Sequence, residues 1–472
     1  MNLRAKELFS NTFLFAIAQL GAKVMVFLMV PFYTSVLSVE EYGESDLIFT
    51  LIAVMTPIFS MCIADAVLRF CFLERVNPKR LISIGFWTIV FGTVISVVVV
   101  IILGRLSFFN DIRSYLAFVP ILFFLQASYN LFNQFARGIN KVKFSAVSGL
   151  VYTFTLVVSN IFLLAFIKLG ILGYLISFVI SDIVSIIYLS ISCKMITYVG
   201  WEFDKKTSKE MYRYSVPLIP NSLSWWLLNS FSRFIIKDNL GIDAVGVFSA
   251  TLRIPTILTV LCDIFSQAWL LSALKDYGTE ESKQFVRYVY KRYVIVITLI
   301  TGCIISLSYP ISKLLLVGEF GSHWYITPFL FIGVYLGALS GFLGAICSAE
   351  KKTYIHFTTT IVGGIFMVVF SELFVGSLGL NAVAISTMFG YFLIWLLRYI
   401  YIKRILDVGV SLRYGILCFV LLLSIALSVY FSQYFIVISL IFIYCVVNRL
   451  MIFEIIRKLY LEIVEIVISK LK

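Results

Sequence analysis

Residues 10–72 carry the pattern that decides the fold, and they read SNTFLFAIAQLGAKVMVFLMVPFYTSVLSVEEYGESDLIFTLIAVMTPIFSMCIADAVLRFCF. Two apolar runs flank one short turn, and each is longer than the roughly 20 residues that a helix needs to cross a bilayer. The turn is acidic, with Glu40, Glu41 and Glu44. This pattern predicts two membrane-spanning helices with a tight connection, and similar apolar runs recur along the chain.

Charged side chains interrupt both runs. Lys23 falls near the middle of the first run, and Asp65 and Arg69 lie four residues apart toward the end of the second. A charge at the centre of a membrane helix costs about 2.5–3.5 kcal/mol on insertion scales, so it usually faces a partner or a wet cavity. Lys23 cannot easily reach either surface, and we expect a functional role for it. Asp65 and Arg69 could instead form a local ion pair, with Arg69 extending to the membrane surface.

The composition is that of a polytopic membrane protein. Hydrophobic residues make up 61% of the 472 residues, charged residues only 13%, and the mean hydropathy is +1.01. The net charge of +13 does not indicate a nucleic-acid partner, because the basic residues form short clusters between apolar runs. The eight cysteines are scattered without metal-ligand spacing, so neither a metal site nor a disulfide framework is expected.

Apolar run lengths predict an all-α protein with about fourteen transmembrane helices. The expected spans are 12–36, 45–68, 82–104, 115–136, 145–167, 171–193, 214–236, 246–272, 293–312, 324–348, 354–375, 379–401, 412–431 and 434–450. With a cytoplasmic N-terminus, 30 of the 38 Lys and Arg residues fall in inner loops and span ends, Arg398 among them; five fall in outer loops and three inside spans. Because cytoplasmic loops are enriched in Lys and Arg, this bias supports the span count and places both termini in the cytoplasm.

The loops divide the chain into five segments. We expect an N-terminal lobe of six helices, a cytoplasmic interfacial linker, a second six-helix lobe, two further helices and an amphipathic tail, at 1–194, 195–213, 214–404, 405–453 and 454–472. The tail could lie along the membrane surface or fray in water. A faint repeat at an offset of 203 residues pairs Gly43 with Gly246, each opening a span after a short acidic turn. Two parallel lobes would produce this repeat, and so would chance.

Polar stripes run along two of the predicted spans. The fourth carries Gln126, Asn130, Asn133 or Gln134, and Arg137 on one face, and the seventh carries Asn221, Trp225, Asn229, Arg233 and Lys237 at steps of four. A polar stripe in a membrane helix must face protein or water. The stripes could form the wall of a hydrophilic lumen, or they could hydrogen-bond between helices.

Further charges lie inside later spans. The candidate lumen residues are Asp182 in the sixth span and Arg253, Asp263 and Gln267 in the eighth. Cations in a lumen attract an anionic substrate such as a diphosphate, and acids could neutralise them or take up a proton or Na⁺ to couple transport to a gradient. No GxxxxGK[ST] loop for ATP is present, and no cofactor is expected.

Two groups of motifs stand out along the chain: NTFLFAIAQLGAKVMVFLMVPFYTSVLSVEEYG with a later AVLRF, and YSVPLIPNSLSWW with Gly246 and FSQAW. In these motifs the sequence resembles Wzx-type polysaccharide flippases of the multidrug/oligosaccharidyl-lipid/polysaccharide exporter superfamily. This resemblance implies two lobes around a cavity and translocation, by alternating access, of an oligosaccharide on undecaprenyl diphosphate across the bacterial inner membrane. It would make Lys23, Asp65, Arg69, Arg233 and Arg253 lumen or portal residues. Membrane lipid, and the polymerase and chain-length proteins of the pathway, would be the partners.

Three other functions compete with this reading. A drug or metabolite antiporter of the same fold would need a net acidic cavity for cationic drugs, whereas three cations lie inside spans here. A polysaccharide polymerase or ligase would need catalytic residues in a large outer loop, yet the outer loops are short and the chain has only two histidines. A scaffold that transports nothing would not explain charges held in mid-membrane. We therefore expect a transporter and not an enzyme.

Overall fold

The computed structural model describes residues 21–457 except 22, 73–76, 201–203, 276–279, 351, 455 and 456. Within these residues every regular element is a helix. In the part of the chain that the structure describes, nine helices are long and apolar enough to cross a membrane, and a tenth is obtained if the bent pair Ile242–Thr251 and Thr256–Asp263 counts as one span. The predicted class, an all-α polytopic membrane protein, is confirmed; the count of fourteen stays a prediction.

The chain forms two compact units. Unit 1 runs to Arg253 and takes in Leu315–Ser322 and Ser371–Leu380, and unit 2 holds the remainder. The helices of unit 1 are α2 (Val30–Val36), α3 (Val39–Phe59), α4 (Ile63–Cys71), α5 (Pro78–Leu103), α6 (Phe118–Gly138), α7 (Val142–Asn160), α8 (Gly170–Cys193), α9 (Lys205–Ser215), α10 (Ile219–Asn229), α11 (Ser232–Leu240) and α12 (Ile242–Thr251). Those mainly or wholly in unit 2 are α13 (Thr256–Lys275), α14 (Glu280–Ser306), α15 (Ser308–Leu315), α16 (Thr327–Ala349), α17 (Thr353–Leu378), α18 (Leu380–Lys403), α19 (Leu412–Tyr430) and α20 (Tyr434–Val447).

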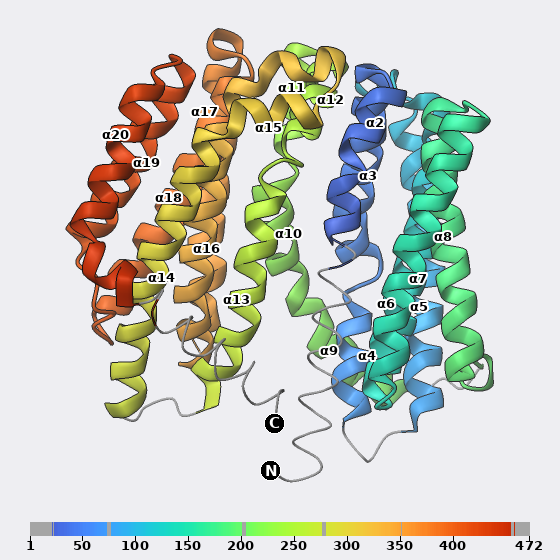
Figure 1. Cartoon of the computed structure of the whole chain (residues 1–472). Coiled ribbons are helices and arrows are strands. Elements are labelled where there is room, and N and C mark those ends of the chain that lie inside the picture. The colour runs from blue at the N-terminus through green and yellow to red at the C-terminus, as the bar shows by residue number, and fades with distance from the viewer. Residues whose placement is uncertain are drawn as a thin grey trace, which may run out of the picture. The chain divides into compact units, whose positions relative to one another are not determined.

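Unit 1 includes α9 to α12, which the sequence assigned to the linker and the second lobe. The predicted segment boundaries stay a proposal. Inside unit 1 the long helices α5, α6, α7 and α8 run side by side (Figure 1).

Several predicted spans are broken into two helices. The span expected at 45–68 consists of α3 and α4, separated at Met61 and Cys62, whose φ angles of 52° and 50° are left-handed. The span expected at 214–236 is interrupted between α10 and α11, and the one at 246–272 bends by 43° between α12 and α13. Helix breaks at membrane depth are tolerated where protein or a wet cavity surrounds them. The apolar run length gave no sign of these breaks.

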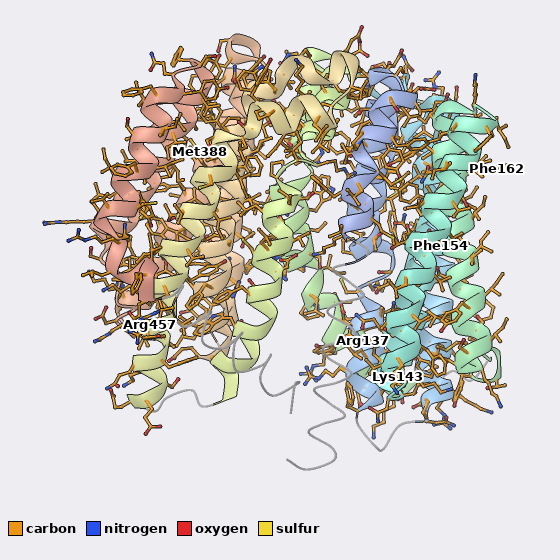
Figure 2. All side chains as sticks on the ribbon, in the orientation of Figure 1. Arg137, Lys143, Phe154, Phe162, Met388 and Arg457 are labelled. Carbon is orange, nitrogen blue, oxygen red and sulfur yellow. The ribbon has the colours of Figure 1, made fainter. Side chains whose placement is uncertain are left out.

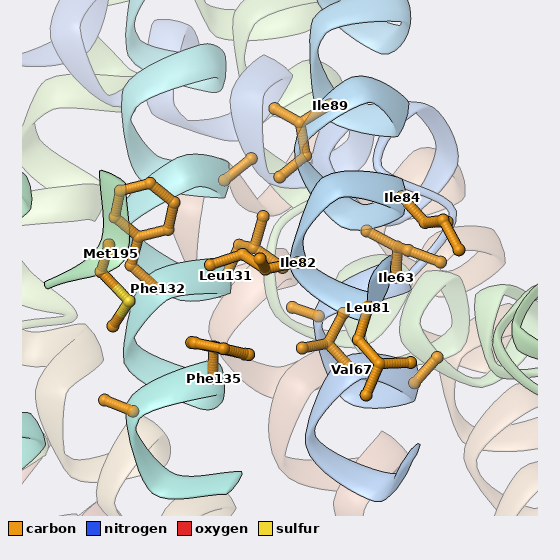
Figure 3. Packing of buried hydrophobic residues seen from close by; sticks show 14 of the residues in the cluster. Ile63, Val67, Leu81, Ile82, Ile84, Ile89, Leu131, Phe132, Phe135 and Met195 are labelled. Carbon is orange, nitrogen blue, oxygen red and sulfur yellow. The ribbon is translucent and has the colours of Figure 1, made fainter. Parts of the chain in front are cut away.

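The core of unit 1 lies between α4, α5 and α6. Its fully buried members include Ile63 and Val67 of α4, Leu81 of α5, and Leu131 and Phe135 of α6 (Figure 3). Lipid is as apolar as these side chains, so close packing and dispersion, more than exclusion of water, hold the helices together.

Apolar and charged side chains of unit 1 occupy different places along α6, α7 and η3 (Ile161–Phe166). Phe154 and Phe162 are 66% and 54% exposed, as suits residues that contact lipid. Arg137 and Lys143 lie together at the turn between α6 and α7, apart from both phenylalanines (Figure 2). We call this end of unit 1 the basic end.

Among the described residues of unit 2, the buried Arg398 donates its hydrogen bonds to neutral acceptors. Arg398, counted above among the span-end cations, is 1% exposed. Its guanidinium donates to Thr359 Oγ1, Thr360 Oγ1 and the Ser340 carbonyl, each at 3.0 Å, and to the His356 carbonyl at 3.4 Å. Four neutral acceptors on the facing helices α16 and α17 therefore fix the end of α18.

Arg398→Lys should lower the stability of the protein. A lysine amine cannot serve acceptors spread around a planar guanidinium, so we expect a loss of about 2–4 kcal/mol from unsatisfied buried groups. Thermal unfolding of the detergent-purified protein measures this, with the exposed Arg404→Lys as the control. Equal melting temperatures for the two variants would contradict the structural role of Arg398.

Candidate functional site

A buried acid near the start of α3 organises the site. Ser38 begins the helix with a capping box, in which its hydroxyl accepts from Glu41 N at 3.1 Å and the Glu41 carboxylate accepts from Ser38 N at 2.9 Å. Asp46 follows two turns later and is 8% exposed. The cap therefore sets where on unit 1 this carboxylate lies.

Three side chains from α11, α12 and the residues after α12 converge on Asp46. Arg233 Nε donates to Asp46 Oδ2 at 3.0 Å, and Ser249 Oγ donates to the same oxygen at 2.6 Å. Arg253 Nη2 lies 4.0 Å from Asp46 Oδ1 and also interacts with Tyr42 and Tyr174. We call Asp46, Arg233, Ser249 and Arg253 the Asp46 cluster. With two cations and one anion, it keeps a net positive charge.

The Asp46 cluster sits beside a very close helix crossing. A Cβ atom on Gly43 would lie 2.3 Å from the Ile242 carbonyl oxygen, and one on Gly246 would lie 2.0 Å from the Val39 carbonyl oxygen. Only glycine fits at either position, so the backbones of α3 and α12 touch.

The crossing is symmetric in sequence. The offset of 203 residues that relates Gly43 to Gly246 also relates Val39 to Ile242. Gly43 faces the Ile242 carbonyl, and Gly246 faces the Val39 carbonyl, so each glycine faces the carbonyl four residues before the other glycine. The same offset carries Asp46 to Ser249, which are hydrogen-bonded to each other. The repeat that looked faint in the sequence therefore has a physical counterpart, because its two copies pack on one another.

A second ion pair lies near the same end of unit 1. Lys237 Nζ lies 2.9 Å from Asp111 Oδ2, donates to the Phe108 carbonyl, and is 4.3 Å from the centroid of the Phe108 ring. Asp111 precedes α6 and Arg137 lies near its C-terminal end. A helix of this length extends about 30 Å, so the Lys237 pair and the basic end lie at opposite ends of α6.

The basic end of unit 1 gathers three of the predicted site residues. Asp65 interacts electrostatically with Arg137, and no ion pair between Asp65 and Arg69 occurs among the described residues. The Arg69 guanidinium instead lies over the Tyr214 ring, 4.2 Å from its centroid.

A surface pocket also opens along α9. It has a volume of about 680 Å³, and its lining includes Lys205, Lys209 and Arg213 beside Val216 and Pro217. Basic groups and apolar surface therefore meet in one place on unit 1.

The remaining predicted residues are dispersed. Asn229 is exposed, and its carbonyl accepts from Arg233. Asn130 and Lys23 are exposed on their helices, and Asp263 is half-buried on α13 of unit 2. Gln267 also belongs to α13, but its side chain lies outside the described part. Asp182 is buried inside unit 1, on α8.

Sequence reasoning missed Asp46 and Ser249. Asp46 stands only two residues after Glu44 and was passed over with the acidic turn. The signal that could have found both residues is the 203-residue offset, since extending it three positions beyond Gly43 and Gly246 reaches this pair. Among the described residues, no group of three His, Cys, Asp or Glu side chains could hold a metal ion.

Residues 8–270 match a family model described as polysaccharide biosynthesis protein. A curated relative, the capsular polysaccharide biosynthesis protein CapF of Staphylococcus aureus, is 25% identical over 201 residues. That match covers 42% of this chain and 50% of the relative, so the chain matches only half of the relative's length.

Solved structures of similar fold cover most of the chain. An inward-facing multidrug resistance MATE transporter of the MOP superfamily has a TM-score of 0.68 at 16% identity, over 82% of this chain and 98% of that one. The lipid II flippase MurJ in an inward closed conformation has the same TM-score at 13% identity, over 93% of this chain and all of that one. At such identities the likeness shows the fold alone.

Proposed function

Because this chain belongs to the family of polysaccharide biosynthesis proteins, we propose that it is a flippase for an undecaprenyl-diphosphate-linked oligosaccharide. It would carry repeat units of a surface polysaccharide (O-antigen, capsule or exopolysaccharide) between the leaflets of the bacterial inner membrane, with both termini in the cytoplasm. The observation that carries this proposal is the family match over more than half of the chain. The half-length match to a capsular polysaccharide protein points the same way.

The charge of the Asp46 cluster favours an anionic headgroup. Two guanidinium groups face one carboxylate, and the Arg253 side chain is 40% exposed. Arginine binds phosphate oxygens in a bidentate manner, so a diphosphate suits this cluster better than a cationic drug does. The basic pocket on α9 would admit the same headgroup at the cytoplasmic surface, with its apolar lining against the lipid chain.

The α3–α12 crossing supplies a mechanism. The crossing lies at the end of unit 1 that bears the Asp46 cluster, opposite the basic end, and we take it as the outer gate. Alternating access requires this contact to separate so that the substrate can leave on the outer side. A diphosphate that engages Arg233 and Arg253 would compete with Asp46 for them, which weakens the crossing once substrate is bound.

Cells that lack the gene should lose their surface polysaccharide, and the full chain should restore it. Arg253→Gln should restore about tenfold less or worse, because removing one charge-assisted phosphate contact costs about 1.5–3 kcal/mol. The measurement is surface polysaccharide per cell at matched protein levels, with the exposed Arg105→Gln as the control.

The competing functions give different outcomes. Intact polysaccharide in the deletion strain, together with greater sensitivity to cationic drugs, would favour the antiporter. Accumulation of exported but unpolymerised repeat units would favour a polymerase or ligase.

A further inference from the structure

The interior of α6, α7 and α8 contains a line of polar side chains. Asn133 Nδ2 donates to the Tyr129 hydroxyl at 3.3 Å, and that hydroxyl lies 3.3 Å from Ser148 Oγ on α7. The Tyr129 ring stacks on Tyr152 of α7, with centroids 5.6 Å apart. Tyr129, Asn133 and Tyr152 are half-buried, whereas Ser148 is fully buried. The line therefore leads from an accessible face into the unit.

Asp182 lies in this interior, near the middle of α8. It is 1% exposed, and neither of its carboxyl oxygens has a hydrogen-bond partner among the described residues. Ser185 Oγ, about one turn further along α8, is also buried and has no hydrogen-bond partner within the described part of the chain. A polar atom that is buried at mid-membrane and left unpaired is rare, and it points to something that binds there.

Among the described residues, no charged side chain from the helices that pack on α8 acts on Asp182. From α6 and α7 the titratable groups that interact with it are Tyr129 and Tyr152. The aromatic contacts of α3 with α8 are made by Tyr42 and Phe49, at Tyr174 and Phe178, one or two turns before Asp182. The segment η3 carries no titratable side chain.

The surroundings of Asp182 decide whether its carboxyl group is protonated or ionised. An ionised carboxylate without a partner in the interior costs several kcal/mol, and the group avoids this cost by binding a proton. A metal cation would need several oxygen ligands converging on one point. Among the described residues the carboxyl oxygens of Asp182 have no hydrogen-bond partner, so the group is taken as a site for H⁺.

We propose that Asp182 is a proton-binding site of unit 1 that exchanges its proton with water admitted between α6, α7 and α8. In this conformation the carboxyl group holds the proton. When the helices around it admit water, the group ionises and releases the same proton to solution, so no other reactant is consumed. The site is separate from the Asp46 cluster, whose acid is neutralised by arginines. The sequence grouped Asp182 with the substrate lumen; the proposal makes it the coupling residue instead.

Infrared difference spectroscopy of the full-length purified protein tests this. We expect a protonated-carboxyl band at neutral pH that disappears as the pH is raised, that is absent in Asp182→Asn, and that remains in Asp46→Asn. Asp46→Asn is the matched control, since it removes a buried acid of the same unit that is ion-paired. The spectra are recorded without substrate. A negative result would therefore overturn the proton site without bearing on the flippase proposal.

Two results would overturn the proposal. One is a band of full intensity in Asp182→Asn, because another acid would then hold the proton. The other is a wild-type band that does not respond to pH, because Asp182 would then be a permanently neutral structural group. If Asp182→Asn does not fold, Asp182→Glu decides, because a carboxyl at this position should give a band at a shifted frequency that still titrates.

Discussion

Gly43→Ala should abolish polysaccharide export while the protein still reaches the membrane. The new Cβ would lie 2.3 Å from the Ile242 carbonyl oxygen and 3.0 Å from Gly246 N, both of which are backbone atoms that cannot turn away. Moving α3 and α12 apart costs about 1–3 kcal/mol, as for other overpacked positions, and it also separates Asp46 from Ser249. Gly246→Ala should have the same effect, since its Cβ would lie 2.0 Å from the Val39 carbonyl oxygen.

Gly149→Ala is the matched control. Gly149 lies within α7, where an added Cβ meets nothing within 4 Å, so export should stay at the wild-type level. Surface polysaccharide is compared among the three variants at equal amounts of membrane-inserted protein. Wild-type export by Gly43→Ala would show that transport does not depend on the closed α3–α12 crossing.

Asp46→Asn should reduce export at least tenfold. Breaking a buried ion pair by removing one partner costs about 3–5 kcal/mol, and the partial exposure of Arg253 lowers that figure here. The amide removes the negative charge that Arg233 and Arg253 face, so the crossing loses the ionic interaction that holds α11 against α3. Asp238→Asn, on the exposed end of α11, should leave export unchanged.

A double-mutant cycle identifies the cause of that loss. Removing one arginine as well, in Asp46→Asn with Arg233→Gln, should cost less than the two single changes added together, with a coupling of about 1–3 kcal/mol. Strict additivity would mean that the 3.0 Å contact between Arg233 and Asp46 contributes nothing to transport.

Run length and charge bias predicted the general character of the fold because a bilayer imposes them on any helix that crosses it. The all-helical class of the described residues and membership of the family of polysaccharide biosynthesis proteins are confirmed. Helix breaks such as Met61–Cys62 depend on surrounding protein, which run length does not contain.

The candidate site shows a similar limit. Arg233 and Arg253 stood out because each is a charge within an apolar run, and the structure brings both to one acid. Asp46 lies next to an acidic turn where a carboxylate is ordinary, so its burial could not be predicted. Asp182 was noticed as a charge in mid-span, but local sequence does not tell whether such a residue faces a lumen or neighbouring helices.

The decisive measurement is flipping itself, with purified protein in liposomes that contain a fluorescent undecaprenyl-diphosphate oligosaccharide. A membrane-impermeant quencher added outside reaches only the outer leaflet. Wild-type vesicles should lose nearly all of their fluorescence, whereas protein-free vesicles and those with Gly43→Ala should lose only the outer leaflet's share. If wild-type vesicles, made with folded protein and the glycolipid of the source cells, behave like protein-free vesicles, the chain is not a flippase for this class of lipid.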